Sequence, residues 1–379
     1  MAENTFQNEA AGQTLQHDIV PLLSICIPTY NQASLLKVML EALLPQCAEP
    51  QKVVEVIVLD NASTDHTQSV VHYATRFGPL RYILNTENIG PTNNVIKGPS
   101  QHAVGTYVWV LGSHNLLRPG ALQRVISAIS NNKGYDTFFT NFYCATYPDQ
   151  WPSSAVGGYE GPYSYVGLPK MEDYSVTQWK DLVDPVSSLA TQVYAHIVKT
   201  SIWKDFWGTE TVPVPYADAK STYPHTYMLA KTAFHNPSYY IGEPALTIFN
   251  GAQSWGDLTT RCRVWMHGYP DLVEIFSSVG LCPAKIKRAE RLGSDRVGQL
   301  FFAALGLRNI TACALLPRYL VKYRQHSGAF ATLWRAFLNS RCCFVAHIIV
   351  RVAGWWDQAV DYCLHRCRPA RWYHARNKK

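Results

Sequence analysis

Three polar side chains follow an apolar segment in the stretch VWVLGSHNLLRPGAL, residues 108–122. The segment reads as a strand that ends at Gly112, and Ser113, His114 and Asn115 come directly after it. The carboxyl ends of strands are where α/β proteins bind their ligands, and α/β enzymes commonly carry carboxylates there. This strand end has none, so its side chains offer hydrogen bonds without negative charge.

A second strand end does carry a carboxylate. The β-branched run KVVEVIVLD ends on Asp60 and is followed by NASTDHT, which contains Asp65. A carboxylate at a strand's carboxyl end can hold ribose hydroxyls or a base amide, so Asp60 is predicted to face a ligand. Asp65 is predicted to cap the following helix or to lie in its first turn.

The elements that position these residues alternate between strand and helix patterns. Apolar or β-branched runs predict strands, and segments with apolar residues at helical spacing lie between them. This alternation predicts an α/β fold with a mostly parallel sheet flanked by helices and with ligands at the carboxyl ends of its strands. Later in the chain a helical stretch is expected over residues 186–203 and a strand over 239–249. The first four predicted strands are residues 22–30, 52–60, 80–85 and 105–112.

Charge divides the chain into two unlike parts. From Pro283 onward there are 18 Lys and Arg against 4 Asp and Glu, which leaves 16 basic against 23 acidic residues before it. A basic, aromatic-rich C-terminal part favours an anionic membrane surface. No apolar run is long enough to span a bilayer, and the first 20 residues lack a signal-peptide core. We therefore expect a cytoplasmic protein, peripheral at the inner face of the cell membrane.

Four segments, in this order and spacing, resemble the nucleotide-sugar domain of family 2 glycosyltransferases, which have the GT-A fold. They are SICIPTYNQASLL, VEVIVLDNASTDHT, ILNTENIGPTNN and GTYVWVLGSHNLLRPGAL. The later segment PHTYMLAKTAFHNPSYYIGEPALTIFNGAQSW resembles the acceptor half of bacterial polysaccharide and O-antigen sugar transferases of the abequosyltransferase or rhamnosyltransferase type.

The resemblance implies a domain organisation. Residues 1–20 would be a flexible extension, and residues 21–257 a GT-A (Rossmann-like) glycosyltransferase domain. Within that domain, residues 21–132 would form the nucleotide-sugar half and residues 133–257 the acceptor half. Residues 258–379 would form a helical, basic and membrane-associated region.

The resemblance also implies which residues bind the donor. The loop after the first strand and the carboxylate after the second hold the nucleoside in this family, and the family's metal motif falls on the residues after the fourth strand. The implied donor-binding residues are Pro28, Thr29, Tyr30, Asn31, Asp60, Asn61, Asn88, Gly90, Asn93, Ser113, His114 and Asn115.

The departure from the family is greatest at the metal motif, where two or three Asp are usual. Mg²⁺ and Mn²⁺ prefer oxygen ligands with carboxylate charge, so no cofactor is expected, and a divalent ion is an alternative that this donor set does not favour. The side chains of His114 and Asn115 would instead donate hydrogen bonds to the leaving diphosphate. A protonated His114 would replace part of the missing metal charge.

Inverting members of the family place a carboxylate base at the head of a helix in the acceptor half. The matching place here is Pro224-His225, which has no acid. His225 is predicted to be the general base, because its ordinary pKa of about 6.5 lies near working pH. Asp218 is the second candidate base. The alternative for His225 is a hydrogen-bonded structural histidine.

These observations predict an inverting, metal-independent glycosyltransferase that moves a sugar from a nucleotide-sugar donor to a hydroxyl of a lipid-linked or lipopolysaccharide glycan. The competing hypothesis is a catalytically inactive glycosyltransferase-like protein that binds or scaffolds. A nucleic-acid partner is not expected, because it would explain the basic tail but none of the four motifs.

Overall fold

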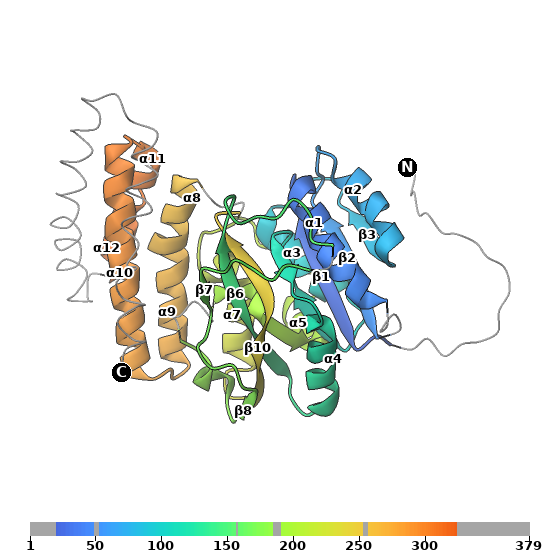
Figure 1. Cartoon of the computed structure of the whole chain (residues 1–379). Helices are drawn as coiled ribbons and strands as arrows, with labels where there is room; N and C mark the ends of the chain where they lie inside the picture. The colour runs from blue at the N-terminus through green and yellow to red at the C-terminus, as the bar shows by residue number, and fades with distance from the viewer. Residues whose placement is uncertain (1–19, 49–52, 157, 185–190, 253–256, 324–379) are drawn as a thin grey trace.

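The computed structural model describes residues 20–48, 53–156, 158–184, 191–252 and 257–323 (Figure 1). Nearly all of the predicted N-terminal extension and the tail beyond residue 323 therefore lie outside the described residues.

A single mixed sheet of ten strands forms the centre of the described part. Its order is β3-β2-β1-β4-β9-β6-β10-β5, with β7 paired to β6 and β8 paired to β10. The strands are β1 (Leu23–Thr29), β2 (Val54–Asp60), β3 (Arg81–Leu84), β4 (Tyr107–Val110), β5 (Asn115–Leu117), β6 (Thr137–Thr146), β7 (Tyr165–Val166), β8 (Tyr174–Val176), β9 (His196–Lys199) and β10 (Ser238–Asn250).

Strands β3, β2, β1 and β4 are parallel neighbours. They are the four strands expected from the first third of the sequence. β1 and β2 are buried along almost their whole length, as is usual for parallel strands covered on both faces. The predicted α/β class, with a sheet flanked by helices and a helical C-terminal region, is confirmed. Beyond β4 the sheet mixes parallel and antiparallel pairs.

The helix expected over residues 186–203 is wrong for residues 191–199, and residues 186–190 lie outside the described residues. His196–Lys199 instead forms β9, which pairs antiparallel to both β4 and β6, and α5 begins only at Thr200. Four residues are too few to show the period that separates a strand from a helix. The neighbouring strands supply the hydrogen bonds that decide the conformation.

Helices cover both faces of the sheet (Figure 1). Alternate strand residues point to opposite faces, so Ile25 and Ile27 pack with α1, α2 and α4, whereas Cys26 packs with α3, α5 and α7. The helices of the domain are α1 (Ala33–Leu43), α2 (Thr67–Ala74), α3 (Pro91–Lys97), α4 (Ala121–Asn131), α5 (Thr200–Trp207), α6 (Ala219–Thr222) and α7 (Pro224–Thr232). Short 3₁₀ or π turns cover Leu44–Cys47, Thr75–Phe77, Gly98–His102, Trp179–Asp181 and Val193–Ala195.

A helical region follows the last strand. α8 (Leu258–Arg263) continues through the π turn Val264–Gly268 into α9 (Tyr269–Ser278), and α10 (Pro283–Gly306) returns alongside them. α11 (Ile310–Cys313) and α12 (Leu316–Tyr323) complete the described part. Among the described residues, no helix combines the length and apolar character that crossing a membrane requires.

Gly268 lets this helical region approach α6. A Cβ atom at Gly268 would lie 2.3 Å from the Thr222 hydroxyl oxygen and 2.7 Å from the Thr222 Cβ. Only glycine fits between α6 and the turn that leads into α9, so this contact fixes the position of α6.

Replacing Gly268 by Ala is expected to destabilise the protein by about 1–3 kcal/mol, since the added methyl group overpacks the contact with Thr222. Urea unfolding measures the change. Gly134→Ala is the matched control, because a Cβ there meets no atom within 4 Å. Equal stability of the two variants would contradict this packing.

Candidate functional site

The carboxyl ends of the four parallel strands bring the predicted residues to one edge of the sheet. Thr29 at the end of β1 pairs with Asp60 at the end of β2, and Asp60 pairs with Leu84 at the end of β3. On the other side of β1, the amide of Leu111 donates to the carbonyl of Cys26. The loops that follow these strands are therefore neighbours along the edge.

Hydrogen bonds fasten the loop after β1 to the loop after β2. Asn31 has a positive φ of 49°, a conformation that asparagine tolerates, and its Oδ1 accepts from the amide of Thr64 at 2.8 Å. The amide of Asn31 donates to Ser63 Oγ at 2.9 Å. Tyr30, between Thr29 and Asn31, is 42% exposed.

Asp65 links the starts of two helices. Its carboxylate accepts from the amide of Ala33, which begins α1, and from the amide of Thr67, which begins α2, each at 3.0 Å. Burial raises the pKa of Asp65, but the hydrogen bond from the Thr67 hydroxyl and these amide bonds outweigh that effect and hold the pKa below its ordinary value. The predicted capping role of Asp65 is thus extended to both helices.

Asp60 is 1% exposed and both of its carboxylate oxygens accept hydrogen bonds. The amide of Ser63 donates to Oδ1 at 2.8 Å and the hydroxyl of Tyr82 donates to Oδ2 at 2.6 Å. Burial and the bond to Asp60 raise the pKa of Tyr82 well above its ordinary value, so Tyr82 stays a donor. Asp60 orders this loop, and its contact with a nucleoside stays a prediction.

A network of amide side chains supports the loop before α3. Asn61 is 2% exposed, and its Oδ1 accepts from the amide of Ile89 at 2.9 Å while its Nδ2 donates to Asn88 Oδ1 at 2.8 Å. Asn88 Oδ1 also accepts from the amide of Gly90. Gly90 has a φ of 83° and no atom would lie within 4 Å of a Cβ there, so it borders open space.

Asn93 has a structural role instead. Its Nδ2 donates to the carbonyl of Val212 at 3.0 Å and to that of Ile89 at 2.8 Å, and its Oδ1 accepts from the amide of Val212 at 2.7 Å. Together with the bond from Thr92 Oγ1 to the carbonyl of Ser221, this joins α3 to the segment that carries α6. The contacts of Asn93 therefore do not support its assignment to donor binding.

After β4, Ser113 and Asn115 are buried and His114 is half-buried. Ser113 Oγ donates to Gln32 Oε1, and Gln32 Nε2 donates to the carbonyl of Ala252 at 3.4 Å. Asn115 Oδ1 accepts from the amide of Gly112 at 2.7 Å, which orients the side-chain amide.

Three buried polar atoms at this edge have no hydrogen-bond partner among the described residues: Thr29 Oγ1, His114 Nδ1 and Asn115 Nδ2. Burial lowers the pKa of His114 to about 4, so its ring is neutral near pH 7. The expectation of a protonated His114 is therefore wrong for the ligand-free protein. The edge offers uncharged groups that can hydrogen-bond to a ligand.

These residues do not fit a divalent cation. Ser113, His114 and Asn115 provide no carboxylate, and the one amide oxygen among them already accepts from Gly112. Within the described ranges, no group of three or more His, Cys, Asp or Glu side chains comes together as a metal site. The chemistry of this donor set suits an anion rather than Mg²⁺ or Mn²⁺.

The two candidate bases have opposite environments. His225, at the start of α7, is 3% exposed, its ring lies 5.4 Å from that of His196, and both its nitrogens lack a hydrogen-bond partner in the described structure. Asp218 is exposed and caps α6, with Oδ1 accepting from the amide and the hydroxyl of Ser221, each at 2.8 Å. Only Asp218 is open to an incoming hydroxyl.

Sequence reasoning missed Gln32 and Tyr82, which contact Ser113 and Asp60. No local pattern marks either residue, because each acts through a strand or loop that is distant in sequence.

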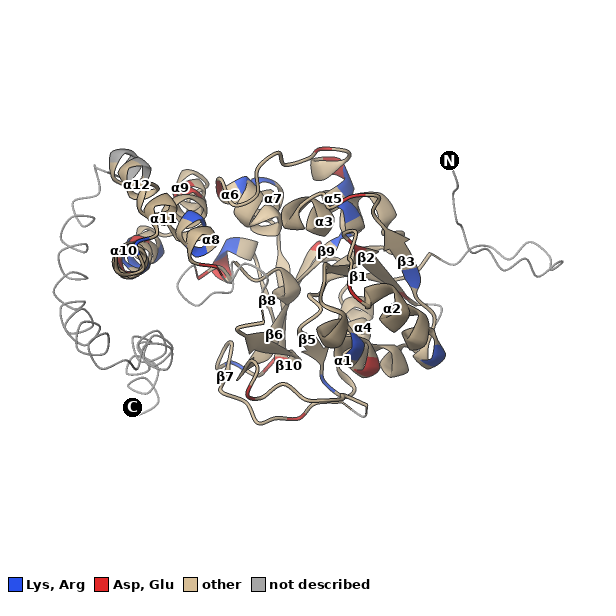
Figure 2. Cartoon of the chain, turned by 90° about the horizontal axis from the view of Figure 1, so that it is seen from above, with Lys and Arg blue, Asp and Glu red and all other residues tan. Residues whose placement is uncertain are grey.

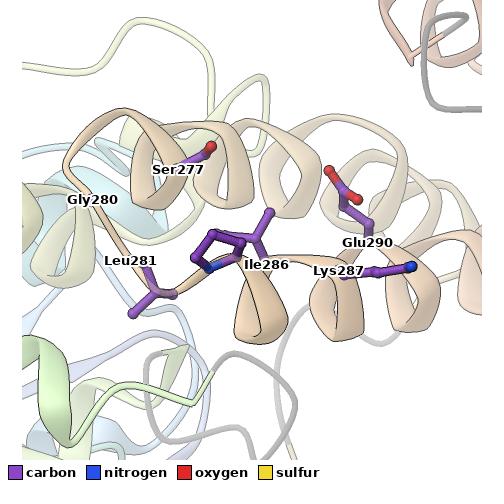
Figure 3. A pocket seen from close by; sticks show the side chains of 7 residues that line it. Ser277, Gly280, Leu281, Ile286, Lys287 and Glu290 are labelled. Atoms are coloured by element: carbon purple, nitrogen blue, oxygen red, sulfur yellow. The ribbon is translucent and has the colours of Figure 1, made fainter.

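An open pocket of about 470 Å³ also lies at the turn from α9 into α10 (Figure 3). It is lined by Ser277, Gly280, Leu281, Pro283, Ile286, Lys287 and Glu290, and it includes none of the predicted site residues.

Residues 24–181 match the family described as Glycosyl transferase family 2. Over these residues the resemblance to family 2 glycosyltransferases found in the sequence is confirmed. The matched residues include the loops after β1, β2, β3 and β4.

Two curated relatives are similar to part of this chain. The abequosyltransferase RfbV of Salmonella typhimurium strain LT2 is 36% identical over 106 residues, which cover 27% of this chain and 30% of the relative. The GalNAc(5)-diNAcBac-PP-undecaprenol beta-1,3-glucosyltransferase of Campylobacter jejuni is 33% identical over 124 residues, covering 32% of this chain and 38% of the relative. The matches thus span less than half the length of these relatives.

A similar solved structure is that of S. aureus TarS. It is 17% identical in sequence, with a TM-score of 0.48, and the alignment covers 72% of this chain and 43% of that one.

The buried pair His196 and His225 predicts a loss of stability in mild acid. Burial lowers the pKa of His196 to about 4, and burial followed by repulsion from His196 lowers that of His225 further below its ordinary value. The unfolded state therefore binds more protons below pH 6.5. Stability should fall as pH drops from 6.5 toward 4, by about 1.4 kcal/mol per pH unit for each histidine.

Urea unfolding of His225→Leu between pH 4.5 and 7.5 tests this effect. In this variant the free energy of unfolding should lose about half of the pH dependence that His196 and His225 contribute. The control His72→Leu, at an exposed histidine, should keep all of it. An unchanged slope in His225→Leu would show that His225 takes up its proton in the folded state.

Proposed function

Because residues 24–181 match the family described as Glycosyl transferase family 2, we propose that this protein transfers a sugar from a nucleotide-sugar donor to a glycan hydroxyl. The observation that carries the proposal is that the matched residues supply the loops at the carboxyl edge of the parallel strands. Ligands of open α/β sheets bind at this edge.

The nucleoside of the donor would lie over the ends of β1 and β2. The loop of Pro28, Thr29, Tyr30 and Asn31 is held in one conformation by its bonds to the next loop, and the buried hydroxyl of Thr29 has no partner in the described structure. Asp60 would contact the nucleoside or fix the loop that does. Asn61, Asn88 and Gly90 would shape the far wall of this donor site.

The diphosphate would lie beside Ser113, His114 and Asn115. Negative charge grows on the diphosphate as the bond to the sugar breaks, and fixed donors in a site shielded from water stabilise it. Asn115 contributes an Nδ2 group that the folded protein leaves unpaired, and neutral His114 contributes an N–H group. The reaction we propose is therefore independent of a divalent ion.

Asp218 would act as the general base in a single displacement with inversion. It removes the proton from the acceptor hydroxyl while the acceptor oxygen bonds to the sugar's anomeric carbon. The bond from that carbon to the diphosphate breaks as the new bond forms, and the nucleoside diphosphate leaves with the electron pair. We favour Asp218 over His225 because the Asp218 carboxylate is exposed and the His225 ring is enclosed.

The acceptor we propose is a lipid-linked or lipopolysaccharide glycan. The name of the Campylobacter relative specifies an undecaprenol-linked acceptor, which supports this class. We further propose that residues 21–132 bind the donor, that residues 133–257 bind the acceptor, and that residues 258–379 hold the protein at the cytoplasmic face of the membrane, where such acceptors are embedded.

A second candidate function is donor binding without catalysis. The observation that favours it is that both acidic signatures of the family are missing, at Ser113–Asn115 and at His225. Under this alternative the protein would bind a nucleotide sugar but would release no nucleoside diphosphate.

Turnover should not need a divalent ion, since the donor set at the diphosphate is uncharged. We expect release of nucleoside diphosphate from a panel of UDP-, GDP-, CDP- and dTDP-linked sugars, with a bacterial membrane extract as acceptor, to change less than about twofold on adding EDTA. Loss of turnover in EDTA, restored by Mn²⁺, would contradict metal independence. Donor binding without turnover would favour the inactive alternative.

Asp218→Asn should lower kcat by about 10²–10⁴-fold, the usual contribution of a general base. The asparagine keeps an oxygen to accept from Ser221, so α6 stays capped and the melting temperature should change little. His225→Leu is the comparison variant. If His225→Leu abolishes turnover while Asp218→Asn retains it, His225 is the base and the assignment here is reversed.

A further inference from the structure

Three large apolar side chains stand exposed at the turn from α10 into α11. Leu305 is 49% exposed, Leu307 is 46% exposed and Ile310 is 82% exposed. Single exposed apolar residues are ordinary, but these three fall within six consecutive positions of one turn. We refer to Leu305, Leu307 and Ile310 as the apolar tip.

The apolar tip is held in place by structured residues. Asn309 caps α11, with its Oδ1 accepting from the amide of Ala312 at 3.0 Å, and its Nδ2 donates to Thr259 Oγ1 on α8 at 3.1 Å. Ala304 and Ala312 are fully buried beneath the turn. The side chains of the tip therefore point outward from an anchored turn.

The apolar tip lies at the same end of the molecule as the candidate site. β9 pairs antiparallel to both β4 and β6, so β6 runs in the same direction as β4. β10 is parallel to β6, and β4 is parallel to β1, so β10 runs in the same direction as β1 and β4. Its carboxyl end, followed by Ala252, therefore reaches the edge where Gln32 and Ser113 lie.

From that edge the chain leads directly to the tip. Asp257, which caps α8, is five residues after Ala252, at most about 18 Å of extended chain. α8 and α9 lead away from the edge, and α10, about 36 Å long, returns to it (Figure 1). The hydrogen bond from Asn309 Nδ2 to Thr259 Oγ1 joins the turn after α10 to the start of α8.

Positive charge lies at this turn and on the neighbouring helix. The exposed Arg308 directly follows Leu307, and Arg261 and Arg263 lie on α8. Figure 2, seen from above, shows α8, α10, α11 and α12 grouped beside the sheet with basic segments on α8 and α10. Apolar side chains flanked by positive charge suit an anionic bilayer.

We propose that the apolar tip inserts into an anionic membrane surface and thereby turns the carboxyl edge of the sheet toward the bilayer. A lipid-linked acceptor presented at that surface would then meet the donor without leaving the membrane. The membrane contact deepens the membrane association proposed above for residues 258–379, and the orientation toward an acceptor rests on the proposed glycosyl transfer.

The test uses the full chain with the substitutions Leu307→Asp and Ile310→Asp together. Binding is measured by co-sedimentation with vesicles of three parts phosphatidylcholine to one part phosphatidylglycerol. The double variant should bind about tenfold or more weakly than the unchanged protein, because two charges oppose insertion. The control is Val20→Asp, at a residue that is 64% exposed and lies before β1 at the opposite edge of the sheet; it should bind normally.

Three outcomes would overturn the proposal. Unchanged vesicle binding by the double variant would mean that the tip does not touch the membrane. A fall in melting temperature would mean that another segment of the chain covers the tip. A shift from dimer to monomer in light scattering would mean that a second copy covers it. The vesicle assay contains no donor or acceptor, so failure of the proposed glycosyl transfer leaves this test intact.

Discussion

The hydrogen bonds between the loops after β1 and β2 are the constraint on which the rest of the site depends. In-register parallel pairing places Thr29 beside Asp60, and the bonds of Asn31 and Asp65 then fix both loops and the starts of two helices. The donor site we propose is therefore largely ordered before any ligand binds. A rigid site loses little conformational entropy on binding, which favours affinity.

The polar side chains at the end of β4 are uncharged, and this distinguishes the candidate site from one built around carboxylates. The orientation of Asn115 is set by Gly112, and burial keeps His114 neutral. Buried groups without partners are costly to the folded state, so a ligand that pairs with them gains that energy on binding. The same groups that destabilise the free protein would thus stabilise a diphosphate.

The sequence predicted the parts of the fold that depend on local patterns. The four parallel strands were visible as β-branched runs, and their common direction follows from the helices between them. The conformation of His196–Lys199 was not predictable, because it depends on neighbouring strands. At the site, residue types identified Ser113, but the contact with Gln32 and the enclosure of His225 depend on packing between distant segments.

The carboxyl edge, as we propose it, binds a nucleoside diphosphate through uncharged donors. Isothermal titration calorimetry with UDP, GDP, CDP and dTDP, in EDTA and then in Mn²⁺, measures this binding. We expect the nucleotide that binds to do so with a Kd that differs by less than about twofold between the two conditions, and Asn115→Leu to weaken binding in both. Binding that occurs only with Mn²⁺ would show that the site needs a divalent ion.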